Sequence, residues 1–423
     1  FSSSFGSGVG GSVTVDVRKV NGIITYLNTV TWNTVYGASG MGIQQRILDY
    51  RILNESTLGT FVGWDVTPAV LEWYENDSTK GALLFAPENE TSIGYFANLT
   101  GHAWYDNSPY FIIRYRNTVG VESYNTYRSL SAARAGDIYI SDFTSQITLM
   151  NNDVSLSTDA VSAEISHVYN TAYTNNLFTS TSESAGIHTC NYSSMDVGKG
   201  WKLSVQQTVV PIIISGSQYL LYNDADGTEH YFINTEADTY QDEDGLGLKI
   251  KKSTSGGNTI YTMTDADENI TRVFHNGYLI SITDSNGNAE YIAYNNCYPA
   301  RNNNWKPTAA GSNRIVQVVM VPKSGALITV ATLGYSGNRL ATITDRTNRV
   351  TSFAYDSNGR VNTITYPDSV IVYYQYDNNG NISKAYDNES HYGLTFTYWS
   401  NHHGGYWVNK VTEFTAADVN ALQ

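Results

Sequence analysis

Apolar and polar residues alternate with a period of two along residues 335–398 of this 423-residue chain. Phe353 and Tyr355 alternate with polar neighbours before the dipeptide Asn358-Gly359, and the alternation resumes over residues 361–365. A period of two is typical of a strand with one buried face. Asn-Gly predicts a two-residue type I′ turn, because both residues tolerate positive φ. The pattern therefore predicts a β-hairpin with one apolar face, closed by a type I′ turn.

The hairpin pattern repeats along the chain. Tyr335, Tyr355, Tyr376 and Tyr398 are separated by 20, 21 and 22 residues. A fixed period in this range is the sign of a repeat architecture. Pro367 favours a second turn, over residues 366–369. We expect the tyrosines of neighbouring units to pack beside one another across strands, and the hairpins to be stable only when they are stacked.

The tyrosines open a short motif. Asp356, Gly359 and Arg360 follow Tyr355 in the order Tyr-Asp-x-x-Gly-Arg, and the unit at Tyr376 repeats most of it. This motif resembles the YD repeat of RHS proteins, and the resemblance covers about residues 165–423. The expected structural signature is Tyr335, Tyr355, Asp356, Gly359, Arg360, Tyr376, Asp377, Gly380 and Tyr398. The resemblance implies a β-hairpin sheet that coils into a shell or tube, which in relatives encloses or displays a C-terminal effector.

A second resemblance lies nearer the N-terminus. The segment Gly-Trp-Asp-Val-Thr-Pro-Ala-Val-Leu-Glu-Trp over residues 63–73, together with segments 31–33, 81–84 and 109–115, resembles the later half of a DNRLRE domain. This resemblance implies a partial jelly-roll-like β-sandwich, similar to carbohydrate-binding modules. Thr67 is expected to cap a short helix that begins at Pro68. A sandwich with open edges predicts self-association, or a partner that supplies the missing strands.

We therefore predict an all-β protein with three parts. Residues 1–116 form the partial β-sandwich, residues 117–199 form a β-rich connector with strands at 137–141, 146–150 and 153–170, and residues 200–423 form the repeat sheet. An Asn- and Pro-rich loop insertion is expected to interrupt the repeats near residues 295–311.

Composition narrows the classes of function. The chain has 33 Tyr but 13 Phe, 15% charged residues, a net charge of −14 and a pI of about 4.9. Because its 25 basic residues form no cluster, we expect no nucleic-acid binding. No apolar run approaches the roughly 18 residues that a spanning helix needs, so we expect no membrane span in this chain. Cys190 and Cys297 could pair or remain free.

The sequence contains no pattern typical of a catalytic site. His-x-x-x-His and Cys-x-x-Cys spacings are absent, and residues 334–337 lack the spacing of a nucleophile elbow. We therefore predict no enzyme activity, no catalytic residue and no metal ligand. Calcium is a weak exception, because Asp224-Ala-Asp226-Gly227 and residues 284–288 place oxygens at alternate positions beside a glycine. Both segments also stand where a hairpin has to turn, and we favour that structural interpretation.

Three functions remain open. The first is a non-catalytic scaffold built from the repeats, secreted or on a bacterial cell surface, that displays or encloses other segments. The second is adhesion to a cell-wall or host glycan through Trp104 and Tyr105, which lie in a polar stretch. The third is the shell of a polymorphic toxin whose effector lies beyond Gln423. We favour the scaffold, because the repeat supports it directly.

Overall fold

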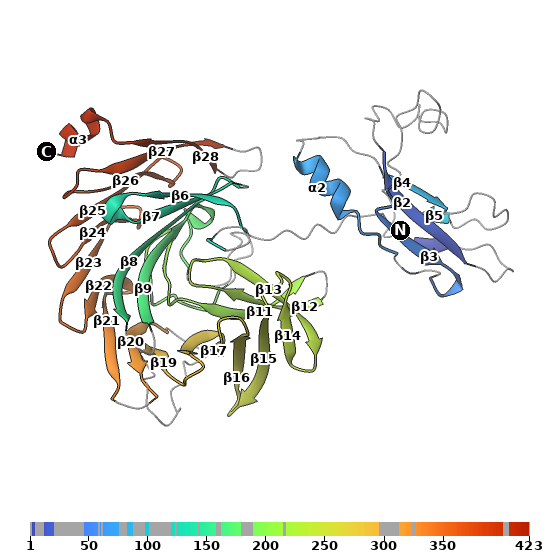
Figure 1. Ribbon diagram of the computed structural model, residues 1–423, viewed down its shortest axis with the longest axis horizontal. Coiled ribbons are helices and arrows are strands. Elements are labelled where there is room, and N and C mark those ends of the chain that lie inside the picture. Colours follow the sequence, from blue (N-terminus) through green and yellow to red (C-terminus); the bar gives the residue numbers. More distant parts are fainter. Residues whose placement is uncertain are drawn as a thin grey trace. The chain divides into compact units, whose positions relative to one another are not determined.

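The computed structural model divides the chain into two compact units, residues 1–114 and 115–423 (Figure 1). It describes residues 2–4, 12–20, 46–57, 60, 62–75, 83–87, 98–100, 120–122, 125–142, 144–157, 162–178, 189–214, 217–295, 313–323, 326–400 and 406–422. Strands dominate these residues, so the predicted all-β fold class is confirmed. The finer division into three parts stays a prediction.

The first unit contains small antiparallel sheets. Its elements are β1 (Ser2–Ser4), β2 (Val13–Lys19), β3 (Asp49–Leu53), the 3-10 helix η2 (Glu55–Thr57), α2 (Thr67–Glu75), β4 (Leu83–Pro87) and β5 (Asn98–Thr100). β2 lies between β3 and β4, and β1 pairs with β5. Val17 and Leu53 are buried, and the indole N–H of Trp64 donates to the carbonyl of Val15 at 3.0 Å. The likeness of this unit to a DNRLRE domain rests on the sequence alone.

The start of helix α2 corrects the predicted cap. The amide of Val70 donates to the carbonyl of Val66 at 3.1 Å, so the first acceptor of the helix is Val66 rather than Thr67. The amide of Thr67 donates to Oδ1 of Asp65 at 2.9 Å. The predicted cap at Thr67 was therefore wrong by one residue, because Thr67 is itself the first residue of the helix. The carboxylate of Asp65 accepts the hydrogen bond from its amide.

The second unit begins with a five-stranded antiparallel sheet, which we call the inner sheet. Its order is β10 (Trp201–Leu203), β9 (Ser162–Asn170), β8 (Ile147–Ser157), β7 (Asp137–Ser141) and β6 (Tyr127–Ser131). The 3-10 helices η3 (Ala133–Ala135) and η4 (Thr171–Tyr173) lie between its strands in the sequence. The predicted strand over 153–170 was wrong, because this stretch folds back on itself and Ser157 pairs with Ser162.

The rest of the second unit is one 18-stranded antiparallel sheet in which every strand pairs with the next along the chain. The strands are β11 (Thr208–Ile214), β12 (Ser217–Asn223), β13 (Glu229–Glu236), β14 (Thr239–Asp242), β15 (Leu248–Ser255), β16 (Asn258–Asp265), β17 (Ile270–His275), β18 (Tyr278–Thr283), β19 (Ala289–Tyr294), β20 (Ile315–Val321), β21 (Ile328–Ser336), β22 (Arg339–Asp345), β23 (Val350–Tyr355), β24 (Val361–Thr365), β25 (Ile371–Tyr376), β26 (Ile382–Asp387), β27 (Gly393–Ser400) and β28 (Tyr406–Glu413). The helix α3 (Ala416–Leu422) follows. The predicted insertion near 295–311 lies almost entirely outside the described residues.

The first strands of the long sheet close on themselves. β11 pairs with β18 as well as with β12, through Thr208 opposite Tyr278. The amide of Val209 donates to the carbonyl of Gly277 at 2.9 Å, and that of Leu279 donates to the carbonyl of Gln207 at 3.3 Å. β11–β18 therefore form a closed ring, and β19–β28 continue from it as an open, curved sheet.

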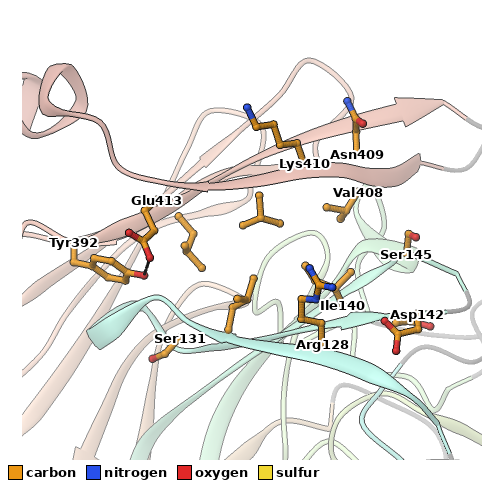
Figure 2. Close-up of a pocket in the computed structure, with 14 residues that line it drawn as sticks. Arg128, Ser131, Ile140, Asp142, Ser145, Tyr392, Val408, Asn409, Lys410 and Glu413 are labelled. Carbon is orange, nitrogen blue, oxygen red and sulfur yellow. Dashed lines mark hydrogen bonds between the residues drawn. The ribbon is translucent and has the colours of Figure 1, made fainter.

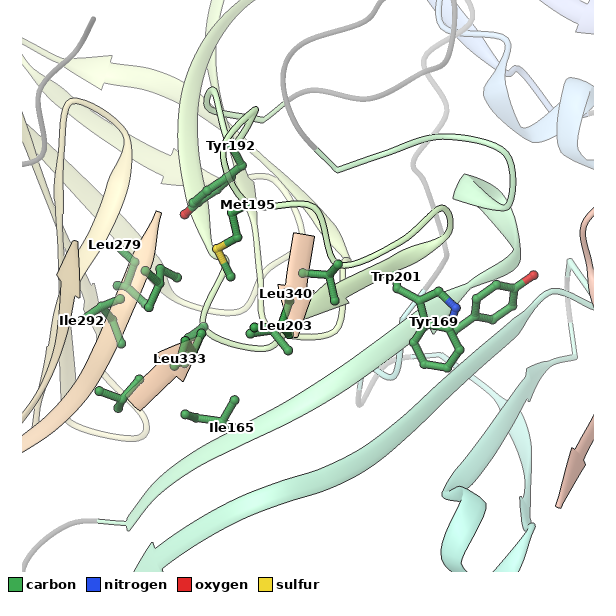
Figure 3. Packing of buried hydrophobic residues seen from close by; sticks show 14 of the residues in the cluster. Ile165, Tyr169, Tyr192, Met195, Trp201, Leu203, Leu279, Ile292, Leu333 and Leu340 are labelled. Atoms are coloured by element: carbon green, nitrogen blue, oxygen red, sulfur yellow. The ribbon is translucent and has the colours of Figure 1, made fainter. Parts of the chain in front are cut away.

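The inner sheet lies inside the curve of the strands that leave the ring (Figure 1). Trp201 and Leu203 of β10 and Ile165 of β9 belong to the same buried cluster as Leu333 of β21 and Leu340 of β22 (Figure 3). One core thus joins the two sheets. Among the described residues, no helix is long and apolar enough to cross a membrane.

Gly277 provides a test of the ring closure. A Cβ at this position would lie 2.6 Å from both Sγ of Cys190 and the carbonyl oxygen of Val209, and its φ is +88°. Gly337 also has a positive φ, +62°, but nothing lies within 4 Å of a Cβ built there. We expect Gly337→Ala to lower the free energy of unfolding by about 1–2 kcal/mol, from backbone strain alone. Gly277→Ala should cost at least about 1 kcal/mol more, because a backbone oxygen has to move.

Urea unfolding of both variants measures the difference. Equal losses of stability would contradict the close approach of the Val209 carbonyl to Gly277 that the ring closure requires.

Candidate functional site

The aspartate of each repeat holds a turn. Oδ1 of Asp356 accepts hydrogen bonds from the amides of Asn358 and Arg360, both at 2.9 Å. The amide of Gly359 donates to the carbonyl of Asp356 at 3.0 Å. Gly359 has a φ of +80°, whereas Asn358 does not have a positive φ. The predicted type I′ turn is therefore wrong. The loop has three residues, and a left-handed glycine follows its turn.

The same aspartate turn recurs along the sheet. Asp377 accepts from the amides of Asn379 and Asn381, at 2.9 and 2.8 Å. Asp284, Asp345, Asp356 and Asp377 all accept in this way from the amides two and four residues further on. The stretch at 284–288, weighed as a calcium loop, is one of these turns, and its carboxylate serves the turn.

The tyrosine of each repeat forms a hydrogen bond to a carbonyl of the preceding repeat. The hydroxyls of Tyr335, Tyr355, Tyr376 and Tyr398 donate to the carbonyls of Ile315, Leu340, Val361 and Ile382 at 2.6, 2.8, 2.6 and 2.7 Å. A β-bulge falls directly before each of these tyrosines. A bulge re-aims the side chain that follows it, which accounts for the shared direction of the four hydroxyls. We call this series of hydrogen bonds the tyrosine ladder.

Arginines cover three rings of the tyrosine ladder. The guanidinium carbons of Arg314, Arg339 and Arg360 lie 4.9, 4.7 and 4.5 Å from the ring centroids of Tyr335, Tyr355 and Tyr376. Arg360 also pairs with Asp356, at 2.7 Å between Nη2 and Oδ2. Each such cation–π contact contributes about 0.5–1 kcal/mol. The signature residues therefore bind one another along the sheet.

The tyrosine ladder also contacts the inner sheet. The indole N–H of Trp201 donates to the hydroxyl of Tyr376 at 2.8 Å. The amide of Ile382 donates to the hydroxyl of Tyr169 at 3.3 Å. Gly380 lies so close to this region that a Cβ would come within 2.6 Å of Oδ1 of Asn175. Burial raises the pKa of Tyr376 well above its ordinary value, so the hydroxyl keeps its proton and stays a donor.

A histidine that the sequence analysis did not single out lies in the core between the sheets. Nδ1 of His167 lies 3.0 Å from both carboxylate oxygens of Asp153, and its Nε2 lies 3.1 Å from the hydroxyl of Tyr374. The side chains of His167 and Asp153 are fully buried. The hydroxyl of Tyr374 donates to the carbonyl of Ala135 at 2.8 Å. This network satisfies buried polar groups and ties the inner sheet to β25.

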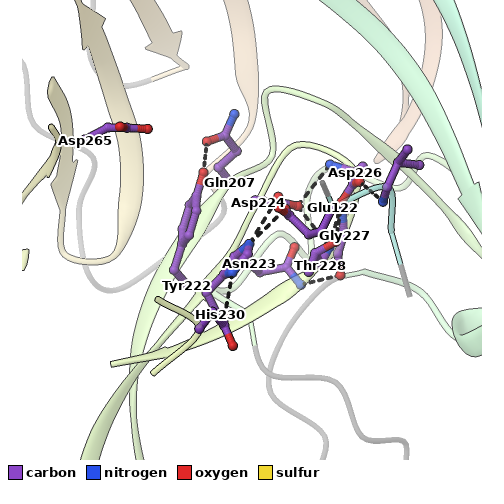
Figure 4. Close-up of polar contacts among 12 residues, drawn as sticks. Glu122, Gln207, Tyr222, Asn223, Asp224, Asp226, Gly227, Thr228, His230 and Asp265 are labelled. Carbon is purple, nitrogen blue, oxygen red and sulfur yellow. Dashed lines mark hydrogen bonds and ion pairs between the residues drawn. The ribbon is translucent and has the colours of Figure 1, made fainter. Parts of the chain in front are cut away.

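A second histidine cluster surrounds the turn between β12 and β13 (Figure 4). Oδ1 of Asp224 accepts from the amides of Asp226, Gly227 and Thr228, at 3.1, 3.1 and 2.9 Å. Oδ2 of Asp224 lies 3.4 Å from Nε2 of His230. The segment weighed as a calcium loop is thus a capped turn whose second carboxylate oxygen faces a histidine.

A groove runs between the edges of the two sheets (Figure 2). It has a volume of about 410 Å³, and its lining includes Leu130, Ile140, Leu394, Val408 and Val411. β6 is an edge of the inner sheet, and β28 is an edge of the long sheet. The amide of Val408 donates to the carbonyl of Ser145 at 2.9 Å, which links β28 to the connection between β7 and β8.

Some expected residues lie outside the described part of the chain. Trp104 and Tyr105, proposed as glycan contacts, are among them, and so is Cys297. The glycan prediction and the pairing of the cysteines therefore stay predictions. Cys190 is buried, and burial raises the pKa of its thiol.

Tyr376→Phe tests the tyrosine ladder. The substitution removes the donor to the carbonyl of Val361 and the acceptor of the Trp201 indole, and both partners are left in the core. We expect the free energy of unfolding to fall by about 2 kcal/mol. Tyr373→Phe is the control, because Tyr373 in the same strand stacks on Tyr386, with the ring centroids 4.9 Å apart. A loss for Tyr376→Phe no larger than the control's would contradict the role given to the hydroxyl.

The buried carboxyl group of Glu290 should make the stability of the protein depend on pH. Glu290 lies on β19 and is 5% exposed. Burial, with a smaller effect from Glu164, raises the pKa of Glu290 to about 8 from an ordinary value of 4.5. Between these values the folded protein retains a proton that the unfolded chain releases. Stability should therefore fall as the pH rises from about 4.5 to 8, by at most about 1.4 kcal/mol per unit from this group.

Glu290→Gln should remove this part of the pH dependence and be more stable than the parent protein at pH 8. Unfolding titrations at several pH values measure it, with the exposed Glu236→Gln as the control. A Glu290→Gln curve parallel to that of the parent protein would contradict the expectation.

Of the comparisons with known proteins, the family match agrees with the repeat. No curated protein matches this chain. Among solved structures, the chain is similar to TcdB2-TccC3 without its hypervariable C-terminal region, at 12% identity, with 64% of this chain and 18% of that chain covered and a TM-score of 0.25. It is also similar to the Tc holotoxin pore of Photorhabdus luminescens, at 13% identity, with 67% and 15% covered and a TM-score of 0.22.

This chain thus spans about a fifth or less of the length of those chains, and TM-scores this low carry no argument about function. Residues 336–371 match the family described as RHS Repeat. This match covers the turn at Asp356 and the ladder residue Tyr355, two of the expected signature positions. The chain therefore contains an RHS repeat.

Proposed function

We propose that the chain is a non-catalytic structural scaffold, in which RHS/YD repeats build a continuous β-sheet that displays or encloses other segments. The observation that carries this proposal is the unbroken antiparallel order of the 18 strands from β11 to β28. Such a sheet is continuous and curved, and its first strands close into a ring. This geometry supports a shell rather than a binding cleft.

The chemistry of the repeats supports a structural role. Asp356 binds amides of its own turn, Tyr376 binds a carbonyl of the preceding unit, and Arg360 lies between them. A catalytic or binding residue has to present its polar group to a ligand. These side chains direct their polar groups at the chain itself, so the signature residues specify the sheet.

The inner sheet bears on what the scaffold encloses. Within the described residues, the concave side of the strands that leave the ring is packed against β8, β9 and β10. This part of the shell is therefore filled by its own chain. Enclosure of another segment requires more sheet, and β28 is the strand from which it would grow, because it pairs only with β27 among the described residues.

Secretion, and a place in the shell of a polymorphic toxin, are narrower forms of this proposal. They rest on the match of residues 336–371 to the RHS Repeat family, together with the resemblance to RHS proteins, which implies such a shell. In either form, the additional strands beside β28 come from a longer chain or from a second copy.

Hydrogen exchange on the complete native protein tests the scaffold. We expect the amides of β28 to be protected to the same degree as those of β26, because further strands pair with its open edge. Fast exchange along β28 together with slow exchange along β26 would mean that the sheet ends there, and would contradict a continuing shell. The isolated chain of 423 residues, kept monomeric by dilution, is the matched control, because neither a longer chain nor a second copy pairs with β28 in it.

A further inference from the structure

Three separate segments meet at the ring of His230. Its Nε2 lies 3.2 Å from Oε1 of Glu122 and 3.4 Å from Oδ2 of Asp224, and these groups all lie within 4.8 Å of one another. Its Nδ1 lies 3.0 Å from Oδ2 of Asp244. Glu122 comes from the start of the second unit, Asp224 from the turn after β12, His230 from β13 and Asp244 from the loop after β14. Figure 4 shows Glu122, Asp224 and His230 converging.

Other contacts hold each group in place. The amides of the turn occupy Oδ1 of Asp224, so that its Oδ2 is the oxygen that faces the histidine. The His230 ring stacks on Tyr222, with centroids 5.6 Å apart and an angle of 23°. Asp244 fixes Nδ1, which leaves Nε2 toward the two other carboxylates. The arrangement is thus fixed by contacts outside the three converging atoms.

The cluster holds more negative than positive charge. Glu122, Asp224 and Asp244 contribute carboxylates that are 18%, 15% and 1% exposed. The positively chargeable groups of the cluster are His230 and Lys202. The Lys202 ammonium donates to Asn223 and to the carbonyl of Asp224. Buried carboxylates require compensating charge. A proton on His230 supplies one unit of charge, whereas a divalent cation at the same nitrogen supplies two.

We propose that Glu122, Asp224 and His230 bind a divalent metal ion of the zinc class, with Asp244 orienting the imidazole. Zinc bonds of about 2.0–2.2 Å to nitrogen and oxygen place tetrahedral ligands about 3.3 Å apart. The two distances from Nε2, 3.2 and 3.4 Å, match that spacing. A carboxylate that receives the other ring N–H is the usual second partner of a metal-bound histidine.

The ligand types distinguish zinc from calcium. Calcium prefers six to eight oxygens, whereas a set of one imidazole and two carboxylates suits zinc. The ion would connect residues 120–122, at the start of the second unit, to the first strands of the closed ring. It would thereby stabilise the contact of this segment with the long sheet.

Protons compete with the metal at this site. Burial lowers the pKa of His230, but hydrogen bonds to Asp224, Asp244 and Glu122 outweigh it and raise that pKa to about 12. Zinc binding therefore releases a proton from His230.

The experiment adds Zn²⁺ to the full chain after treatment with a chelator, and measures the bound zinc, its affinity and the melting temperature. We expect the parent protein to bind one zinc ion, which raises its melting temperature. His230→Gln should bind zinc at least about 100-fold more weakly, and its melting temperature should not rise. Asp244→Asn should weaken binding by about 10–100-fold. Ca²⁺ at the same concentration should leave the melting temperature unchanged.

His167→Gln is the matched control. Asp153 orients His167 just as Asp244 orients His230, but the Nε2 of His167 faces the Tyr374 hydroxyl instead of two carboxylates. His167→Gln should bind the zinc ion and show the same rise in melting temperature as the parent protein. If His230→Gln does not fold by circular dichroism, Glu122→Gln decides, because Glu122 is partly exposed. Zinc binding that is absent in the parent protein, or equal in the parent protein and in the His230 or Glu122 variant, would overturn the proposal, and so would stabilisation by Ca²⁺ alone.

Discussion

The hydrogen bond from a repeat tyrosine to a carbonyl of the preceding unit is the interaction on which strands β20 to β27 of the long sheet depend. A two-stranded hairpin is marginally stable in water, so each unit needs its neighbour. Edge-to-edge pairing alone leaves register open to slippage. The β-bulge before Tyr376 and the bond from its hydroxyl to Val361 fix one register, because any shift would leave a buried hydroxyl without its acceptor.

The rest of the repeat follows from that bond. The tyrosine can reach the carbonyl only if the chain reverses at a fixed point, and Asp356 sets that point by holding the amides of the turn. Arg360 then covers the next ring and pairs with Asp356. The inner sheet completes the arrangement, since Trp201 donates to the same hydroxyl of Tyr376. Function and fold are therefore hard to separate here, because the polar side chains of the repeat stabilise the sheet itself.

The sequence predicted what depends on local pattern. The hairpins follow from a period of two and from turn residues, whereas the tyrosines, Asp356 and Gly359 were singled out by the motif that repeats about every 20 residues. The turn type was wrong because a side chain, the Asp356 carboxylate, selects it rather than the Asn-Gly dipeptide. The helix cap was displaced for the same reason.

What depends on distant contacts could not be predicted. His167 reaches a tyrosine 207 positions away, and His230 meets a glutamate in a segment that precedes the inner sheet. No spacing rule connects such residues. The closure of the ring rests on one pairing, between Thr208 and Tyr278, in strands whose sequences show no special complementarity. Trp104 and Tyr105 were suggested as a glycan site by their residue types, their polar surroundings and a family resemblance, and none of these specifies a distant contact.

A crystal structure of the complete native protein, at a resolution that shows side chains, tests the central claim most directly. The account predicts that all four hydroxyls of the tyrosine ladder lie within hydrogen-bonding distance of the carbonyls of Ile315, Leu340, Val361 and Ile382, and that ordered strands continue beyond β28. Hairpins in another register, with the ladder tyrosines turned to solvent and β28 a bare edge, would contradict it.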